Sequence, residues 1–279
     1  MVAVRVSLLN SIIQLSMSGE RWKLPHVGAD RVARGAAEVF SPVVTDFWRA
    51  TFSGEELLPR GATFTVAVNA ELSEDRRVMV LRTDDGTVKA VLTPALADAV
   101  GLSQLRPQSE AQLRQALGEA GVALYAADNL FYFSRDALDR LLGEAAHPGV
   151  RQLSEADAAL FAQVQASAPE QDRDDAYVEL DHWAVFGAFA QDRLVAVASM
   201  YPWGGARIAD LGVLTLPALR RRGHARALVR ALCKHAAEQG YEPQYRCQLD
   251  NHASLAVAKA VGLTHFGTWE VVSPDSPVD

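Results

Sequence analysis

Cysteine is scarce in this 279-residue sequence, which contains only Cys233 and Cys247. Their spacing fits neither a disulfide framework nor a metal site, which excludes a disulfide-stapled secreted domain and indicates a reducing compartment. We therefore predict a cytoplasmic protein that uses no metal ion. Basic residues are also in the minority, because 27 Lys and Arg stand against 34 Asp and Glu and give a net charge of −7. That balance argues against general nucleic-acid binding.

Long apolar runs are also missing, so no segment is expected to span a membrane. Residues 1–16 are rather apolar, with Arg5 as their only charge, but polar residues interrupt them and no convincing cleavage site follows. We interpret them as a poorly ordered or misassigned leader before a start at Met17, with a weak signal peptide as the alternative. The sequence predicts no membrane partner.

The remaining composition, 49% hydrophobic and 22% charged residues, is typical of a soluble protein with a buried core. One large domain or two of ordinary size fit this length. The turn-forming segment 146–149 (Ala-His-Pro-Gly) is the best linker candidate. We therefore predict a smaller N-terminal α+β domain of unknown role over residues 17–146 and a second domain over residues 150–279.

Hydrophobic periodicity and turn signals place the secondary structure. The first half is expected to contain a helix over 29–52 that Pro42 interrupts, strands over 63–72, 77–82, 87–92, 122–126 and 129–133, and helices from Pro94, over 108–118 and over 135–145. The second half is expected to contain strands over 150–153, 184–190, 194–201, 207–216, 244–249 and 264–272, and helices over 154–166, 172–179, 223–239 and 254–261. Gly212, inside one of these strands, predicts a β-bulge.

The most informative segment is 214–226 (LTLPALRRRGHAR), where an apolar strand breaks at Pro217 and leads through three arginines and Gly223 into a helix. A helix N-terminus presents free backbone N–H groups, and its dipole favours an anion. Gly223 lets a ligand approach the backbone closely, because it has no Cβ. Residues 211–237 contain basic side chains and no acidic one. The segment predicts a phosphate-rich ligand; the alternative is a solvated helix face.

Four sequence features recur together in one known family. They are Arg220-x-x-Gly223-x-Ala225, the preceding Thr215-Leu-Pro217, Asn251-x-x-Ser254, and the closing pair Gly262-Leu263. In this order they resemble the GNAT superfamily of acyl-CoA N-acyltransferases, whose phosphate loop reads Gln/Arg-x-x-Gly-x-Gly/Ala. The strand over 241–247, with its proline and aromatic residues, is similar to one branch of that family. The resemblance is strong over about residues 206–267, weaker from about 150, and absent before.

The resemblance implies a GNAT fold for residues 150–279, a mixed and mostly antiparallel central sheet flanked by helices. It implies transfer of an acetyl group from acetyl-CoA to an amine, by direct attack in a ternary complex. Backbone N–H groups of the arginine loop would bind the pyrophosphate, and the strand before it would pair with the pantetheine amides and leave a cleft beside its neighbour. The cofactor-binding residues implied in this way are Val213, Leu214, Thr215, Arg220, Arg221, Arg222, Gly223, His224, Ala225, Arg226, Asn251 and Ser254. Asn251 and Ser254 are also helix-capping candidates.

The catalytic residues are harder to predict, because the two positions that usually hold the family's base and acid are alanine in this sequence. The glutamate that often serves as the base is replaced by Ala209, so neighbouring Asp210 is the first candidate, provided that a bulge turns it toward the site. Asp181 and His182 are the alternatives. A primary amine titrates near pH 10, so a base or a water relay is required at neutral pH.

The usual tyrosine acid is replaced by Ala258. Tyr245 or Tyr201 can substitute, or the thiolate can leave without an acid, because a thiol titrates near pH 8.5.

The acceptor is expected to be a small-molecule or peptide amine. An acidic cluster attracts a cationic amine or is simply a solvated helix and loop; its members are Asp172, Asp174, Asp175, Glu179 and Asp181. Two further hypotheses remain open. One is a CoA-binding regulatory module that has lost catalysis, as Ala209 and Ala258 suggest. The other is an N-terminal domain that mediates interaction or homodimerisation and only shapes the acceptor site.

Overall fold

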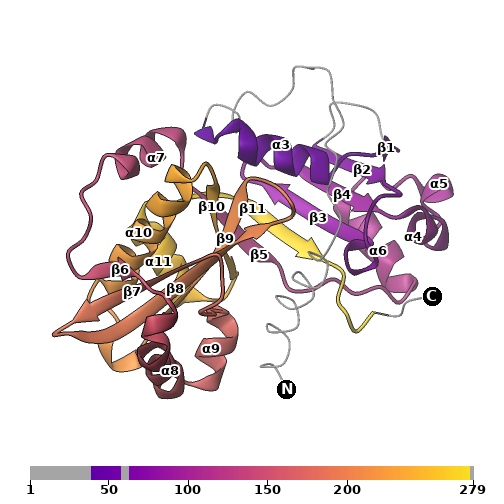
Figure 1. The fold of residues 1–279 in the computed structure, drawn as a ribbon. Coiled ribbons are helices and arrows are strands. Elements are labelled where there is room, and N and C mark those ends of the chain that lie inside the picture. Colours follow the sequence, from indigo (N-terminus) through magenta and orange to yellow (C-terminus); the bar gives the residue numbers. More distant parts are fainter. Residues whose placement is uncertain (1–38, 58–62, 277–279) are drawn as a thin grey trace.

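The computed structural model describes residues 39–57 and 63–276 (Figure 1). The predicted leader over residues 1–16, the proposed start at Met17 and the first part of the helix predicted over 29–52 lie outside the described residues. No helix within the two described ranges combines the length and the apolar character needed to cross a membrane.

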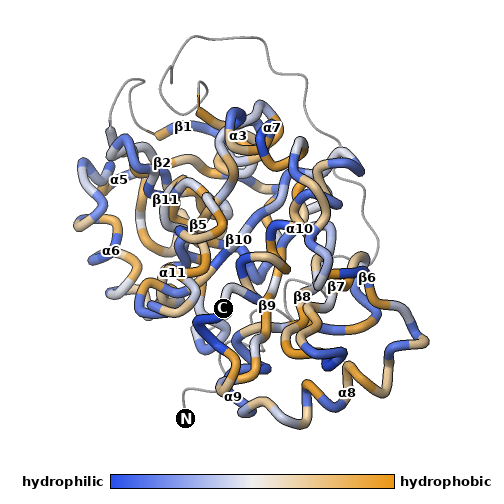
Figure 2. Tube along the Cα trace, turned by 90° about the vertical axis from the view of Figure 1, so that its left-hand side faces the viewer, coloured by the Kyte–Doolittle hydropathy of each residue, from blue (hydrophilic) through white to orange (hydrophobic). Residues whose placement is uncertain are grey.

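Within the described residues, eleven strands form one mixed sheet in the order β1-β2-β4-β3-β11-β5-β10-β9-β8-β7-β6. The strands are β1 (Glu55–Glu56), β2 (Phe64–Val68), β3 (Val78–Thr83), β4 (Val88–Leu92), β5 (Asp128–Tyr132), β6 (Val150–Gln152), β7 (Ala184–Ala190), β8 (Arg193–Trp203), β9 (Ile208–Thr215), β10 (Glu242–Gln248) and β11 (Thr264–Val271). Most neighbours are antiparallel, and the pairs β9–β10 and β2–β4 are parallel. Figure 2 shows hydrophobic stretches along β8 and β9.

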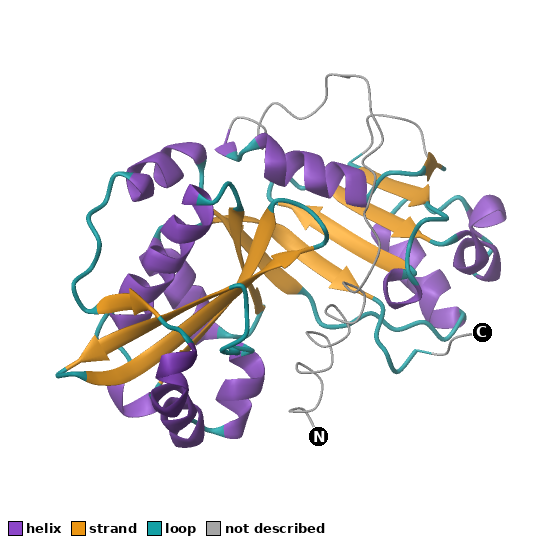
Figure 3. Ribbon diagram, in the orientation of Figure 1, coloured by secondary structure: helices purple, strands orange, loops and turns teal. Residues whose placement is uncertain are grey.

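Helices flank this sheet (Figure 3). They are α3 (Pro42–Thr51), α4 (Pro94–Ala99), α5 (Leu102–Leu105), α6 (Glu110–Glu119), α7 (Arg135–Leu142), α8 (Ala158–Ser167), α9 (Glu170–Ala176), α10 (His224–Glu238) and α11 (His252–Val261), with 3₁₀ turns at Glu74–Arg76, Glu155–Asp157 and Pro217–Leu219. The helix order predicted for the second half is therefore confirmed, and most boundaries lie within a few residues of those expected.

Side-chain caps explain where several helices begin. The hydroxyl of Ser41 accepts from the backbone N–H of Val44, and Pro42 occupies the first turn of α3. Proline is favoured there because its missing N–H would have no helical partner. The interruption predicted at Pro42 is present as a helix start: Val39 is helical, Phe40 and Ser41 are not, and Pro42 is the first residue of α3. Thr93 and Ser134 cap α4 and α7 in the same way.

The sheet runs across the predicted domain boundary at residue 150. Strand β5, which precedes this boundary, lies between β10 and β11, and both of these follow it. Strand β11 in turn pairs with β3 of the first half. The N-terminal region therefore adds α+β elements to the same sheet, and its division into a separate domain stays a prediction. Of the strand predicted over 122–126, the structure contains one bridge, between Leu124 and Val272.

The two faces of the sheet pack against different cores. On β9, Ala209 and Leu211 belong to the core that α10 and α11 cover, together with Tyr245 of β10. Ile208 belongs to a second core, around Trp48 of α3, and Leu214 belongs to a third, which α8 covers. Because side chains alternate along a strand, Asp210 points to the face of Ile208, away from α10.

Candidate active site

A cleft opens where β9 and β10 separate. The two strands pair in parallel from Ile208 to Leu211, opposite Glu242 to Tyr245. Beyond this point β9 continues to Thr215 along β8 alone, and β10 continues to Gln248 along β5 alone. The divergence leaves a cleft of about 860 Å³ whose lining comes from both faces of the sheet. This separation is the one that the resemblance predicted for the strand before the arginine loop.

Gly212 lies where β9 and β10 separate, and β9 has no bulge at this position. The register between β8 and β9 is unbroken through the Ser199–Gly212 pair, so the predicted bulge was wrong. Glycine is needed for a different reason, because a Cβ on Gly212 would lie 1.8 Å from the carbonyl oxygen of Ala176 at the end of α9. The sequence signal was real, but it marks close packing of backbone on backbone.

The arginine loop and the N-terminus of α10 form one end of the cleft. Gly223 precedes the first residue of α10 with φ of 86°, a left-handed conformation that a residue with a side chain rarely adopts. A Cβ placed there would meet no atom within 4 Å, so the backbone faces open space. The N–H groups of the first turn of α10 therefore stand at an accessible helix N-terminus, as an anion site requires.

The arginines of the loop and of the first turn of α10 are all exposed, and two of them are also hydrogen-bonded. Arg220 donates to the Thr215 carbonyl oxygen at 3.2 Å and to Asp172 at 2.6 Å, and Arg226 donates to the Ala260 carbonyl oxygen at 2.8 Å. Arg221 and Arg222 are exposed. Of the predicted cofactor-binding residues, Arg222 alone does not line the cleft; it lies at a second cavity beside α10. The residue before it, Arg221, has φ of 61°, which turns the chain at this point.

Strand β9 presents backbone groups to the cleft. The N–H of Leu216 donates to the Val195 carbonyl on the β8 side, and the bonding direction alternates along a strand. The backbone groups of Val213 and Thr215 therefore point toward the side from which β10 has departed. The hydroxyl of Thr215, which lines the cleft, is buried with no hydrogen-bond partner among the described residues.

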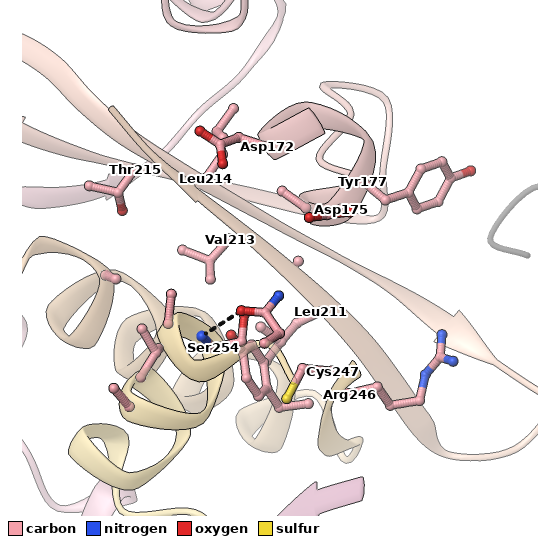
Figure 4. A pocket seen from close by; sticks show the side chains of 18 of the residues that line it. Asp172, Asp175, Tyr177, Leu211, Val213, Leu214, Thr215, Arg246, Cys247 and Ser254 are labelled. Carbon is pink, nitrogen blue, oxygen red and sulfur yellow. Dashed lines mark hydrogen bonds between the residues drawn. The ribbon is translucent and has the colours of Figure 1, made fainter. Parts of the chain in front are cut away.

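Opposite β9, the cleft is lined by β10 and the start of α11 (Figure 4). Asn251 caps α11, because its side-chain oxygen accepts from the Ser254 backbone N–H at 3.0 Å. The capping role weighed for Asn251 is thus present, while both residues also line the cleft. Tyr245 is buried, and burial raises the pKa of its phenol although its hydroxyl bonds to Ser254. Ala258 is fully buried and does not line the cleft.

A hydrogen-bonded ionic network lies on the opposite face of the sheet. The carboxylate of Asp210 accepts from Arg246 Nη2 at 2.6 Å, from Gln244 at 3.0 Å and from the Tyr201 hydroxyl at 3.2 Å. Arg246 also donates to Asp128 at 3.2 Å, and its side chain is only 6% exposed. Asp210, predicted as the base from its neighbour Ala209, therefore lines the cleft with its oxygens already occupied.

Asp128 is, like Arg246 and Gln244, a residue of this face that the sequence did not reveal. It lies at the start of β5, outside the GNAT-like half, and lines the cleft with Tyr125 and Ala126 of the preceding segment. Burial and the nearby charge of Asp210 raise the pKa of its carboxyl to about 6, although Arg246 opposes the shift. No motif marks it, because only the pairing of β5 between β10 and β11 brings it to the cleft.

The alternative bases lie outside the cleft lining. Asp181 is exposed. The buried imidazole of His182 bonds through Nδ1 to the Ser199 hydroxyl at 2.7 Å and packs against the rings of Tyr177 and Tyr201, which do line the cleft. Burial lowers the pKa of His182, so the neutral imidazole is favoured.

Part of the predicted acidic cluster does reach the cleft. Asp172 and Asp175 of α9 line it, and Asp172 is paired with Arg220. Burial and the charges of Asp172, Asp174 and Asp250 raise the pKa of Asp175. The two α9 carboxylates that line the cleft, Asp172 and Asp175, therefore outnumber the cation paired with them, Arg220. Among the described residues, no group of three or more His, Cys, Asp or Glu side chains is arranged to hold a metal ion.

The geometry agrees with a comparison against known families. The model of the acetyltransferase (GNAT) family matches residues 152–263. These residues contain the arginine loop, the separating strands β9 and β10, and helix α11. The C-terminal part of the chain is therefore a GNAT domain, and the remaining α+β elements extend its sheet.

The chain is also similar to several solved structures, each over part of its length. A GNAT-family acetyltransferase from Colwellia psychrerythraea is 17% identical over 83% of this chain and 96% of its own, with a TM-score of 0.46. A putative GNAT acetyltransferase from Novosphingobium aromaticivorans is 18% identical over 55% of this chain and 66% of its own, just under two thirds, with a TM-score of 0.40. An aminoglycoside N-acetyltransferase, AAC(6')-Iy, solved in complex with CoA, is 22% identical over 40% of this chain and 89% of its own, with a TM-score of 0.33. No curated protein matches the chain.

Proposed function

We propose that this protein is an N-acetyltransferase that moves an acetyl group from acetyl-CoA to a primary amine by direct attack. The observation that carries the proposal is the cleft itself. It runs from the accessible N-terminus of α10, through the gap between β9 and β10, to the buried carboxylates of Asp128 and Asp210 on the other face of the sheet. One elongated anionic ligand and one cationic acceptor can therefore meet inside the sheet.

Each part of the cleft has a distinct task in this proposal. The loop from Arg221 to Ala225 binds the pyrophosphate through backbone N–H groups, with Gly223 giving the close approach. Val213 and Thr215 pair their free backbone groups with the amides of the pantetheine arm, and one N–H stabilises the oxyanion as the amine attacks. Asn251 and Ser254 flank the arm from α11. The carboxylates of Asp128 and Asp210 attract the ammonium form of the acceptor.

The thiolate is expected to leave without a dedicated acid. Burial raises the pKa of Tyr245 above that of an ordinary phenol, so a thiolate of conjugate pKa about 8.5 is too weak a base to take its proton. Tyr245→Phe should therefore lower kcat less than about tenfold and leave the alkaline side of the pH profile unchanged up to about pH 9. Steady-state rates of Tyr245→Phe and Tyr201→Phe from pH 6 to 9 test this. An alkaline fall in the native enzyme that either substitution removes would contradict it.

The second candidate is a CoA-binding module without catalysis. It is favoured by alanine at positions 209 and 258, both fully buried and outside the cleft lining. Turnover separates the two candidates: thiol release from acetyl-CoA, followed with a thiol reagent against a panel of spermidine, tyramine, kanamycin and a lysine peptide, should exceed the amine-free rate at least about a hundredfold for one acceptor. Tight acetyl-CoA binding by calorimetry without turnover of any amine would favour the module.

The N-terminal half is proposed to shape the acceptor site, because Tyr125, Ala126 and Asp128 line the cleft. Homodimerisation is a separate hypothesis that the solution mass of the intact chain tests.

A further inference from the structure

We infer that Asp128, supplied by the N-terminal half, is the general base for the acceptor amine, and that Asp210 positions it through Arg246. The inference rests on the proposed acetyl transfer and names the residue that makes it work at neutral pH. It differs from the expectation drawn from the sequence, which sought the base on the strand before the arginine loop.

Strand register places Asp128 on the acceptor side of the sheet. Asp128 pairs with Gln248 of β10, and Arg246 lies two residues before Gln248, so all three side chains emerge on one face. Gln244 is two residues further back and pairs with Asp210, which extends the same face to β9. The anion-binding loop and Tyr245 belong to the opposite side. A thioester reaching through the gap between β9 and β10 would therefore present its carbonyl carbon to the face that carries Asp128.

The carboxylates of Asp210 and Asp128 differ in the number of hydrogen bonds that they accept. Both oxygens of Asp210 accept from Arg246, and Gln244 and Tyr201 donate to them as well. Among the described residues, the side-chain donor within hydrogen-bond distance of Asp128 is Arg246, through one nitrogen at 3.2 Å. Asp128 therefore keeps lone pairs for a proton from the acceptor, while Asp210 fixes the guanidinium that orients Asp128.

The charges that face Asp128 set the pH at which it can act. They are Arg246 of β10 and Asp210 of β9; the neighbouring pair partners Gln248 of β10 and Trp269 of β11 carry no charge. Burial and Asp210 raise the pKa of the Asp128 carboxyl to about 6, against the opposing charge of Arg246. The carboxylate form therefore predominates at pH 7, while its basicity exceeds that of an ordinary aspartate.

The proton balance of the step is simple. Asp128 takes one proton from the acceptor's ammonium group, and the freed nitrogen lone pair forms the C–N bond with the thioester carbonyl carbon. The C–S bond then breaks and the electron pair leaves on sulfur as the thiolate. The second nitrogen proton passes to water, and Asp128 returns its own proton to water before the next cycle.

Asp128→Asn and Asp210→Asn form the matched pair that tests the inference. With the amine from the panel that turns over fastest, kcat/KM of the native enzyme should rise with pH to a plateau, with an apparent pKa near 6. Asp128→Asn should lose about a hundredfold at pH 7 and lack this rise, because its rate would follow the free amine and recover about tenfold per pH unit toward pH 9. Asp210→Asn should keep the rise and move it to lower pH, because removing that negative charge lowers the pKa of Asp128.

Calorimetry with acetyl-CoA at pH 7 checks that each variant is folded and binds as the native chain does. Asp128→Glu restores a carboxylate and should restore an ascending limb, which provides the test if Asp128→Asn is unstable. A limb that survives Asp128→Asn but disappears in Asp210→Asn would overturn the assignment while leaving acetyl transfer intact. A native enzyme that acetylates no amine in the panel would overturn both.

Discussion

Gly223→Glu is expected to lower the affinity for acetyl-CoA by about a hundredfold or more. The φ of 86° at Gly223 aims the following N–H groups at the open end of the cleft, and a side chain there would both strain that turn and occupy the space meant for the ligand. Each charge-assisted hydrogen bond lost to a phosphate costs about 1.5–3 kcal/mol, and about 1.4 kcal/mol corresponds to a tenfold change in affinity. The glutamate charge adds repulsion. Calorimetric titration with acetyl-CoA measures the effect.

Gly240 offers a matched control for the backbone strain at Gly223. It also has positive φ, 77°, also has no atom within 4 Å of a Cβ position, and follows the opposite end of α10 without lining the cleft. Gly223→Ala and Gly240→Ala should therefore destabilise the fold by similar amounts, about 1 kcal/mol. Only the substitution at Gly223 should weaken acetyl-CoA binding. Equal affinities for the native chain and Gly223→Glu would rule out the loop as the phosphate site.

Local signals in the sequence predicted the second half of the fold well. The strand predicted over 184–190 has the bounds of β7, and α10 (His224–Glu238) lies within one residue of the predicted range 223–239 at each end. These features depend on periodicity and capping, which neighbouring residues determine. The phosphate-loop residues were predictable for the same reason, because the loop, the helix N-terminus and the glycine are contiguous.

Features set by long-range pairing were not predictable. Nothing near Asp128 indicates that β5 lies between β10 and β11, so its place in the cleft follows only from the assembled sheet. Asp210 was identified by position, but its hydrogen bonds to Gln244, Arg246 and Tyr201 depend on the register of three strands. Gly212 predicted a β-bulge and instead marks a close backbone contact, because both features require a glycine within a strand.

Gly212→Ala is expected to damage both the fold and the cleft, since the added Cβ would lie 1.8 Å from the Ala176 carbonyl oxygen and 3.3 Å from that of Tyr177. Both contacts are with backbone, so no side-chain rotation relieves them, and either β9 or the end of α9 must move. Such overpacking costs about 1–3 kcal/mol or more, which lowers Tm by about 2–6 °C or more for a chain of this size. Movement of α9 also displaces Asp172, Asp175 and Tyr177 from the cleft wall, so kcat/KM should fall at least about tenfold beyond the effect of stability.

Gly267→Ala separates these two effects. A Cβ at Gly267 would lie 2.2 Å from the Arg82 carbonyl oxygen, again a backbone clash within the sheet, but between β11 and β3 and away from the cleft lining. Thermal unfolding should show comparable losses of Tm for the two variants. Acetylation rates measured well below both transitions should then fall for Gly212→Ala and stay near native for Gly267→Ala. If the two variants lose activity equally, Gly212 matters for stability alone and the end of α9 does not shape the acceptor side of the cleft.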